Sequence, residues 1–464
     1  MRNLIFLLAL GIAFAQPPGI EGDWHGTLNT GAVQVRLGLH ITKTSTGEYT
    51  STLDSIDQAQ MGLPITRTSF SGRTLHFEFL AAHIEFDGTL AADGSRIDGT
   101  FTQGVQLPLT FTRGNATEPV KRTQKPQAPF PYDSVDVSYQ NMAGGVTLAG
   151  TLTFPRGGGP LPAAILITGS GPQDRDETIL GHKPFLVIAD YLARRGIAVL
   201  RLDDRGVGKS TGNSRRATID DMAADVLAGV GFLKSRKEID ARHIGVIGHS
   251  EGGLVGPLAA SRSADIAFVV MLAGPGVTLE QILYKQGELI RRSAGAGDQA
   301  DAQARAVQEM VIGILKSEPD EKAAGEKIRA GWKKMKSSRP EGERTQMDAL
   351  DALIEQQGAA FNVPEMRSML TYDPAVALRC LEVPVLALNG SRDLQVSPEQ
   401  NLPAIVSALS AGGKSEFTVT ELPGLNHLFQ KCTECTVAEY GKIPETFSPV
   451  ALRILGDWLV QHTR

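Results

Sequence analysis

The feature that most constrains this chain is a glycine-flanked serine in the segment Gly248-His249-Ser250-Glu251-Gly252-Gly253. The apolar run 244–247 precedes it, and a helix-compatible segment, 254–260, follows it. This order of strand, sharp turn and helix places Ser250 at the top of a buried strand, where glycines tolerate a strained backbone because they lack a Cβ atom. The G-x-S-x-G pattern alone is weak in a chain with 50 glycines among 464 residues. In this context it predicts a nucleophile elbow.

From residue 132 to the end of the chain, strand-like and helix-like segments alternate. Such alternation builds a mostly parallel sheet that is covered by helices on both faces. We expect the first two strands to pair antiparallel and the others parallel. The expected strands are 135–139, 146–154, 163–168, 197–202, 243–248, 266–273, 383–389 and 417–422. The expected helices are 184–195, 219–237, 252–263, 398–410 and 448–462.

The alternation stops after residue 274, where a long helical, charge-rich segment replaces the single crossover helix that such a sheet needs. We therefore expect a helical cap, residues 277–375, inserted into the domain 132–464. Amphipathic helices are expected at 304–316, 322–336 and 346–357. Five of the ten methionines fall in the cap. Their flexible side chains favour a role as core filler, although a lid over a substrate would use the same residues.

Residues 20–114 predict a separate, small antiparallel β-barrel or sandwich. Apolar and polar residues alternate strictly over 33–42 and again over 75–79, as in strands with one wet face. The Asp-Gly pairs at 87–88, 93–94 and 98–99 indicate hairpin turns. A packed barrel is favoured over a container for an apolar ligand. The histidines of this domain, His25, His40, His76 and His83, lack metal-ligand spacing, so we assign them no chemistry.

The ends of this β domain carry two further signals. Residues 1–15 combine a basic start, an apolar run of 4–14 and an A-x-A site at 13–15. This pattern predicts a secretory signal peptide, because the apolar run is too short to span a membrane. Residues 115–131 are rich in proline and predict an extended linker. We expect the protein to be periplasmic or secreted.

Charge and composition narrow the classes of partner. The 46 basic and 51 acidic residues give a net charge of −5, which provides no electrostatic footprint for nucleic acid or an anionic membrane. No later segment is apolar enough to span a membrane. A small-molecule substrate is the expected partner, and the oligomeric state is left open.

The stretch 169–176, which reads G-S-G-P-Q-D-R-D, and the G-H-S-E-G-G elbow together resemble the α/β-hydrolases. Within them the chain is similar to secreted bacterial carboxylesterases. The resemblance covers the region from about residue 135 onward and implies an eight-stranded, mostly parallel sheet. It also implies a Ser-Asp/Glu-His catalytic triad in that chain order, without a cofactor or a metal.

The chain order selects the partners of Ser250. Among the histidines well beyond the elbow, His462 lies at the chain end, whereas His427 follows the last expected strand, where the family carries its general base. Asp393 follows the strand 383–389 and is the expected acid. Asp373 and Glu382 also satisfy the order, but Asp373 belongs to the cap and Glu382 lies at the wrong end of a strand.

An oxyanion intermediate needs two preorganised donors. The backbone amide of Glu251 is the first, because it follows the nucleophile. The second is expected from the loop 168–172, and since Pro172 has no N–H, either Ser170 or Gly171 supplies it. The Glu251 carboxylate would oppose catalysis if it faced the oxyanion. We therefore expect it to point away, toward Arg175 or Arg205.

Other motifs have weaker interpretations. The Gly-Lys-Ser at 208–210 lacks the first glycine of a phosphate loop, and the loop 203–210 is interpreted as structural. The segment 173–177 either faces the pocket or forms a salt-linked loop. Of the three cysteines, Cys432 and Cys435 form a C-x-x-C pair. In an exported protein this pair predicts a local disulfide that stiffens the loop after His427.

These observations predict a serine esterase that cleaves carboxylic esters of short to medium acyl chains through an acyl-enzyme. Two alternatives remain open: a serine peptidase of the prolyl oligopeptidase-like or aminopeptidase type, and a non-catalytic ligand-binding module.

Overall fold

The computed structural model describes residues 19–29, 34–58, 60–114, 120–157, 159–348 and 350–463. The chain divides into two compact units, Met1–Pro119 and Val120–Arg464. The expected signal peptide lies outside the described residues. Each unit is considered by itself below.

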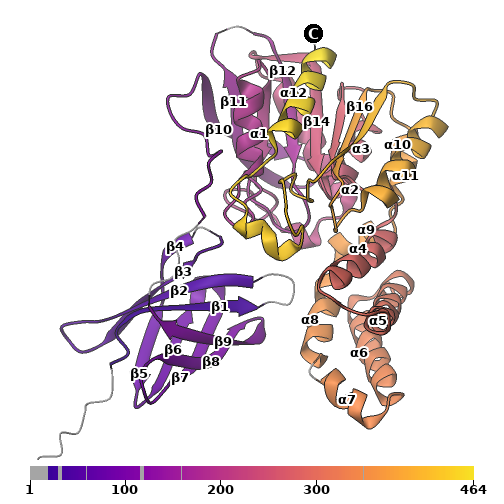
Figure 1. Cartoon of the computed structure of the whole chain (residues 1–464). Coiled ribbons are helices and arrows are strands. Elements are labelled where there is room, and N and C mark those ends of the chain that lie inside the picture. Colours follow the sequence, from indigo (N-terminus) through magenta and orange to yellow (C-terminus); the bar gives the residue numbers. More distant parts are fainter. Residues whose placement is uncertain are drawn as a thin grey trace, which may run out of the picture. The chain divides into compact units, whose positions relative to one another are not determined.

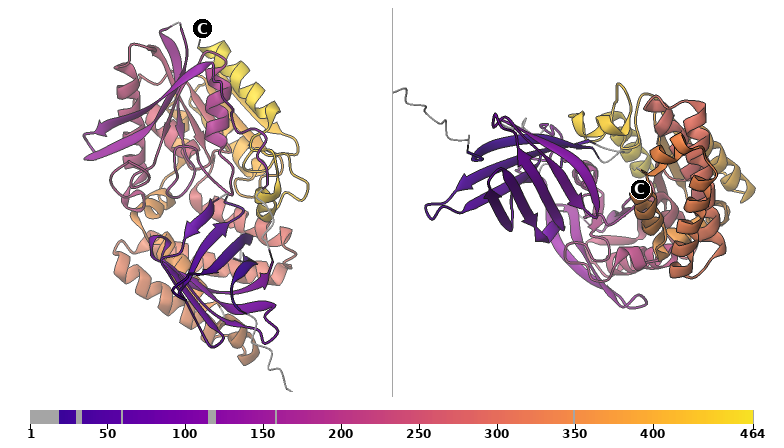
Figure 2. Two further views of the ribbon diagram at one scale, coloured as in Figure 1. Left: turned by 90° about the vertical axis from the view of Figure 1, so that its left-hand side faces the viewer. Right: turned by 90° about the horizontal axis from the view of Figure 1, so that it is seen from below.

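The N-terminal unit is one antiparallel sheet of nine strands in the order β4-β3-β2-β1-β9-β8-β7-β6-β5. The strands are β1 (Gly22–Asn29), β2 (Gln34–Lys43), β3 (Tyr49–Ser55), β4 (Gln60–Pro64), β5 (Arg67–Ser71), β6 (Thr74–Phe79), β7 (Ile84–Leu90), β8 (Arg96–Gln103) and β9 (Val105–Arg113). The alternation predicted for β2 places Leu37, Leu39 and Ile41 in the core. Figure 2 shows the curl of this sheet.

A single curled sheet, rather than two packed sheets, makes this unit a half-barrel. Strands β3 and β5 approach each other, and the hydroxyls of Ser51 and Thr68 are hydrogen bonded at 2.6 Å. The concave side is filled by large side chains, among them Trp24, Phe77, Phe86 and Phe111, all fully buried. The filled interior agrees with the prediction of a packed β domain, which was favoured over a container for an apolar ligand.

Two of the three Asp-Gly pairs were wrongly predicted to be turns. Only the pair at 93–94 lies between strands; Gly88 is inside β7, Gly99 is inside β8, and the two glycines face each other across the ladder. A Cβ atom on either glycine would come within 2.5 Å of the Phe86 ring. These glycines therefore make room for an aromatic side chain, a packing requirement that local turn chemistry does not reveal.

The second unit contains an eight-stranded sheet in the order β10-β11-β13-β12-β14-β15-β16-β17. The strands are β10 (Tyr132–Asn141), β11 (Val146–Pro155), β12 (Leu161–Ile167), β13 (Ala198–Leu202), β14 (Ile239–His249), β15 (Val269–Leu272), β16 (Val385–Gly390) and β17 (Phe417–Leu422). Strand β11 is antiparallel to both β10 and β13, and the remaining pairs are parallel. The antiparallel pair of β10 and β11 and the parallel pairs from β12 to β17 are as predicted, whereas the antiparallel pair of β11 and β13 was not predicted.

Helices cover both faces of this sheet (Figure 1). One face packs against α1 (Pro184–Ala193) and α12 (Pro449–His462) around Phe185, Phe268 and Trp458. The other packs against α2 (Ile219–Lys234), α3 (Gly252–Ala260), α10 (Pro374–Arg379) and α11 (Pro398–Ala411). Because both faces are covered, the central strands are buried nearly throughout, and their carboxyl ends carry the loops that form the site.

The inserted cap consists of α4 (Leu279–Ser293), α5 (Asp298–Ser317), α6 (Glu321–Ser337), α7 (Glu341–Asp348), α8 (Asp351–Phe361) and α9 (Pro364–Leu370). Figure 1 shows these helices grouped beside the sheet. A small core of Ile312, Leu315, Ala324, Ile328 and Leu370 holds them together. The helix predicted at 346–357 is not continuous, because it spans the end of α7 and the beginning of α8.

The proline-rich segment predicted as a linker is attached to the second unit over its described part. The Arg122 guanidinium donates to the carbonyls of Leu180, Gly441 and Ile443. The side chain of Gln124 donates to the Phe447 carbonyl and accepts from the Thr446 amide. Residues 120–124 are therefore anchored beside the loop that follows β17 rather than free in solvent.

Among the described helices, none combines the length and the apolar character that crossing a membrane requires.

Candidate active site

The predicted elbow is present between β14 and α3. Ser250 has a φ of +53°, a left-handed conformation that is strained for a residue with a side chain. The surrounding glycines are required by close contacts: a Cβ on Gly248 would lie 1.9 Å from the Gly252 carbonyl oxygen, and one on Gly252 would lie 2.3 Å from the Ile167 oxygen. The strained turn thus presents Ser250 at the carboxyl edge of the sheet.

Asp393 and His427, predicted from chain order, lie together. The loop after β16 carries Asp393 and the loop after β17 carries His427, and both side chains are buried. The Nδ1 atom of His427 is 2.8 Å from Oδ2 of Asp393. The other carboxylate oxygen, Oδ1, accepts from the amides of Gln395 and Val396 at 2.8 and 2.9 Å. The carboxylate is therefore fixed and can hold one tautomer and orientation of the imidazole.

Ser250 is brought to this pair through its neighbour. The Nε2 atom of His249 is 3.0 Å from the backbone carbonyl of His427, and the two imidazole rings are 4.9 Å apart. The described residues show no hydrogen bond between the Ser250 hydroxyl and His427. Catalytic hydrogen bonds are often long in unliganded enzymes and shorten when substrate binds.

His249 also contacts a buried glutamate that sequence reasoning did not assign. Its Nδ1 atom is 2.9 Å from Oε1 of Glu177, and the same oxygen accepts from the Gly169 amide at 2.7 Å. Both ring nitrogens of His249 thus face acceptors, an arrangement that suits the doubly protonated imidazolium. Burial alone lowers the pKa of His249, but the Glu177 carboxylate and the His427 carbonyl outweigh burial and raise it. The elbow, the 168–172 loop and the histidine loop meet at this one ring.

The hydrogen bonds of the 168–172 loop distinguish its amides. The Gly169 amide is used by Glu177. The Gly171 amide faces the Glu365 carboxyl. Burial raises the pKa of Glu365, against the smaller, lowering effects of the Arg215 charge and of this amide. Among the described residues, the amides of Ser170 and Glu251 have no protein acceptor. These two amides remain free to receive a developing negative charge.

The expected partners of the Glu251 side chain were wrong, and the Ser170 side chain is hydrogen bonded to it. Arg175 pairs with Asp203 at 2.6 Å, and Arg205 pairs with Asp225 at 2.6 Å. Glu251 is instead buried without a cation. Burial, together with the nearby Glu365 carboxyl, raises the pKa of Glu251 to about 8. At neutral pH the side chain is therefore mostly uncharged and does not oppose an oxyanion.

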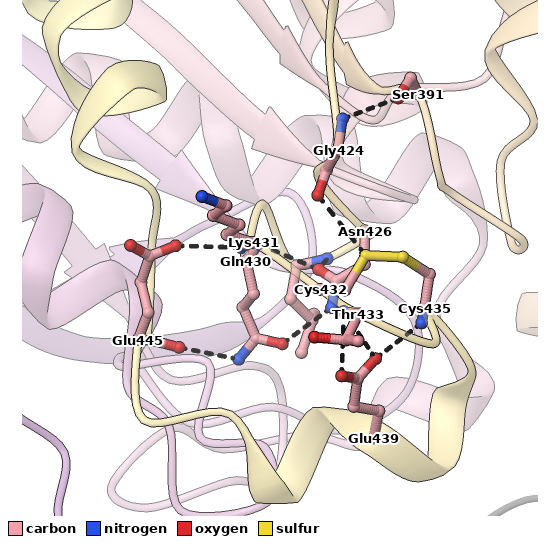
Figure 3. The surroundings of a disulfide bond; sticks show 11 residues. Ser391, Gly424, Asn426, Gln430, Lys431, Cys432, Thr433, Cys435, Glu439 and Glu445 are labelled. Carbon is pink, nitrogen blue, oxygen red and sulfur yellow. Dashed lines mark hydrogen bonds between the residues drawn. A yellow bond between two sulfur atoms is a disulfide. The ribbon is translucent and has the colours of Figure 1, made fainter.

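A network of hydrogen bonds and a disulfide hold the histidine loop (Figure 3). The structure joins Cys432 and Cys435 in the disulfide, while Cys380 is free and exposed. The Glu439 carboxylate accepts from the Cys435 amide at 2.6 Å. Next to His427, the side-chain amide of the buried Asn426 donates to Oε1 of Gln430 at 3.0 Å.

The remaining sequence candidates lie elsewhere. Asp373 caps α10, where it accepts from the Ala375 amide at 3.0 Å, and Glu382 is exposed. His462 lies on α12, where its Nδ1 atom is 2.8 Å from the Trp458 carbonyl oxygen. Within the segment 173–177, Arg175 forms an ion pair with Asp203. Asp176 forms ion pairs with Lys183 and Arg201. The salt-linked interpretation of this segment therefore describes the structure.

Potential metal ligands cluster at two places within the described residues. One group is Cys432, Cys435 and Glu439, in which the cysteines are already bonded to each other. The other is His76, Glu85 and Asp87 on the N-terminal sheet, two of which are exposed. Neither group includes a residue of the elbow or of the Asp393–His427 pair.

The sheet order, the strained elbow and the loops that follow β16 and β17 define this protein as an α/β-hydrolase. Residues 184–431, more than half of the chain, match the family described as serine aminopeptidase, S33, and the chain belongs to this family. The esterase EstD of Thermotoga maritima is 39% identical over 139 residues, which is 30% of this chain and 33% of that protein. The chain thus spans about a third of the length of this relative.

Solved structures show more distant similarity. An esterase of Pyrococcus furiosus is 17% identical with a TM-score of 0.44, covering 75% of this chain and 100% of the other. The Est1E protein of Butyrivibrio proteoclasticus, solved with ferulic acid, is 18% identical with a TM-score of 0.40, covering 70% and 98%.

The Glu177–His249 pair yields a prediction about stability. Replacing His249 with Ala leaves a buried carboxylate unpaired, so we expect the free energy of unfolding to fall by about 3–5 kcal/mol, measured by urea denaturation. In a Glu177→Gln background the same replacement should lower the free energy of unfolding by less. The stabilisation is complete below the ordinary pKa of His249, 6.5, and is lost as the pH rises past its raised pKa.

The matched control is His243→Ala on the same strand, whose pair with Asp240 at 3.0 Å is partly exposed. This change should cost no more than about 1 kcal/mol. Equal effects of His249→Ala in the two backgrounds would show that the two side chains are not coupled.

The disulfide yields a second prediction. The Cys432→Ser/Cys435→Ser variant opens a very short loop, so the unfolding free energy should fall by about 2 kcal/mol on the loop-entropy model. The control variant Cys380→Ser, at an exposed free cysteine, should have an unfolding free energy within about 0.5 kcal/mol of the wild-type value. Thiol titration of the unreduced, denatured protein should find Cys380 alone. Titration of all three cysteines before reduction would contradict the bond.

Proposed function

We propose that the protein is an exported carboxylesterase that cleaves esters of short to medium acyl chains through an acyl-enzyme. The observation that carries the proposal is the buried 2.8 Å hydrogen bond between Asp393 and His427, beside a serine on a strained elbow. The similarity of part of the chain to the esterase EstD supports esters as the substrate class. The signal-peptide pattern at 1–15 supports export.

In the proposed reaction, the Ser250 oxygen attacks the acyl carbon and its proton passes to Nε2 of His427. Asp393 holds Nδ1 and stabilises the resulting imidazolium. The amides of Glu251 and Ser170 bind the oxyanion of the tetrahedral intermediate. Collapse of this intermediate breaks the ester bond, and His427 gives its proton to the leaving alcohol. Water then repeats the sequence on the acyl-enzyme, releasing the acid and free Ser250.

A peptidase is the second candidate, because the description of the matching family names an aminopeptidase. Amides and esters share the same tetrahedral intermediate, so the triad alone does not separate the two reactions. A direct comparison of ester and anilide substrates does.

We expect the wild-type protein to hydrolyse p-nitrophenyl esters from acetate to octanoate faster than aminoacyl anilides. The Ser250→Ala variant should lose at least about 10³-fold in kcat/KM for the esters, because no nucleophile remains. Ser410→Ala, at an exposed serine on α11, is the matched control and should behave as wild type. Preference for the anilides would identify a peptidase. Ester turnover that persists in Ser250→Ala would reject the nucleophile.

The raised pKa of Glu251 predicts an alkaline limit. Below pH 8 its carboxyl is neutral; above its pKa of about 8 a negative charge appears beside the proposed oxyanion site. If the ionised form is inactive, kcat/KM for p-nitrophenyl butanoate should fall about tenfold per pH unit above this pKa. The Glu251→Gln variant should not show this decline, whereas the exposed cap variant Glu326→Gln should retain it. Identical pH profiles for wild type and Glu251→Gln would contradict the assignment.

A further inference from the structure

A buried tyrosine connects the two loops that carry Asp393 and His427. Tyr440 is 1% exposed and lies on the short helix η3 (Val437–Lys442). Its hydroxyl is hydrogen bonded to the backbone amide of His427, and Nε2 of Gln395 donates to it at 3.3 Å. The backbone amide of Gln395 in turn donates to Oδ1 of Asp393 at 2.8 Å. One hydroxyl therefore links the loop after β16 to the loop after β17.

The helix that carries Tyr440 is not part of the sheet or of its covering layers. It belongs to the segment 432–448 between the histidine loop and α12, and Figure 3 shows Glu439 of this helix directed toward the disulfide. A 3₁₀ helix has poor hydrogen-bond geometry, so its position depends on contacts with other segments. The Tyr440 carbonyl oxygen makes one such contact, at 3.0 Å from Nε2 of the buried His182.

Arg122, on the proline-rich segment, binds both sides of this contact. Its guanidinium donates to the carbonyl of Gly441 at 2.8 Å and to that of Ile443, which follow Tyr440 in the chain. It also donates at 2.7 Å to the carbonyl of Leu180, close to His182 in the sequence. A guanidinium presents five N–H donors in a fixed plane, so one side chain can hold several carbonyls in a set arrangement. Arg122 therefore holds η3 against the segment that carries His182.

Gln124 holds the other end of the segment 432–448. Its Oε1 atom accepts from the amides of Thr446 and Phe447 at 2.6 and 3.0 Å, and its Nε2 atom donates to the Phe447 carbonyl at 2.6 Å. The Phe447 ring stacks on that of Phe429, with the ring centroids 5.1 Å apart. Phe429 belongs to the same loop as His427. The proline-rich segment is thus connected to His427 by two routes.

We propose that Arg122 is a positioning residue that acts on His427 through Tyr440, so that the segment 120–124 is a working part of the active site. The inference rests on the proposed esterase function. Proton transfer from Ser250 requires the imidazole to lie within hydrogen-bond reach, and a misplacement of about 1 Å can cost about 10²-fold in rate. Three backbone carbonyls held by one guanidinium limit such a displacement of the segment behind His427.

The test measures kcat and KM for p-nitrophenyl butanoate on full-length variants that circular dichroism shows to be fully folded. Tyr440→Phe removes only a hydroxyl, and Arg122→Ala removes the guanidinium. Each should lower kcat about tenfold and leave KM within about twofold, because neither side chain holds the substrate. Arg122→Lys retains a charged donor and should recover part of the loss.

Two matched controls should behave as wild type in the same assay. Lys121→Ala changes an exposed residue beside Arg122. Tyr139→Phe changes a buried tyrosine whose hydroxyl has no hydrogen-bond partner among the described residues. A tenfold fall in kcat in either control would show that the effect is not specific to the contacts of Tyr440.

A double-mutant cycle shows whether Arg122 acts through Tyr440. If it does, Arg122→Ala/Tyr440→Phe should be about tenfold slower than the wild type, like each single variant, because the second change removes a contact that is already lost. Independent contributions would multiply to about 100-fold. That result, or a wild-type kcat in either single variant, would overturn the inference and leave the esterase function standing. A loss of stability alone, with kcat unchanged, would also overturn it.

Proton NMR separates this inference from the proposed function, because it needs no hydrolysis. The Nδ1 proton of His427, hydrogen bonded to Asp393, should give a downfield signal that His427→Ala lacks. The signal should shift or broaden in Tyr440→Phe and Arg122→Ala and stay in place in Lys121→Ala. Such a change in a protein that cleaves no ester would support the positioning role and reject the esterase function. An unchanged signal in both variants would reject the positioning role, whatever the turnover.

Discussion

The geometry of this site depends on one buried imidazole. His249 lies between the Glu177 carboxylate and the His427 carbonyl, and both are acceptors. Because Glu177 also binds the Gly169 amide, the ring connects three loops that arise from strands distributed across the sheet. The elbow glycines set the position of Ser250, Asp393 orients His427, and the His249 ring links the loops that carry these residues. The residue before Ser250 is thus as important for the architecture as Ser250 itself.

Much of the fold could be predicted because its signals are local. Buried parallel strands produce continuous apolar runs, and the elbow combines such a run with glycines at fixed spacing. The partners Asp393 and His427 followed from chain order, since each comes directly after a strand whose carboxyl end must reach the same edge of the sheet. The long insertion between β15 and β16 was visible as a break in this alternation.

The errors arose where the deciding contact is distant in sequence. Gly88 and Gly99 had the composition of turns, but they pair with each other across the β7–β8 ladder, where both lie against the Phe86 ring. Glu177 lies 72 residues from His249, and nothing in its neighbourhood indicates that it pairs with the elbow. The expected cations for Glu251 were taken by Asp203 and Asp225, which compete for the same arginines. Charge pairing among many acids and bases is decided by three-dimensional proximity, which composition does not encode.

The helix α9 has a consequence for how such a protein can diversify. Glu365, on α9 of the inserted segment, lines one cavity together with Asp204 and Glu251, which belong to loops of the sheet itself. One wall of this cavity therefore comes from the inserted segment, which contains none of Ser250, Asp393 and His427. Exchange of that stretch between duplicated genes would alter which molecules are accepted while the inherited chemistry stays intact.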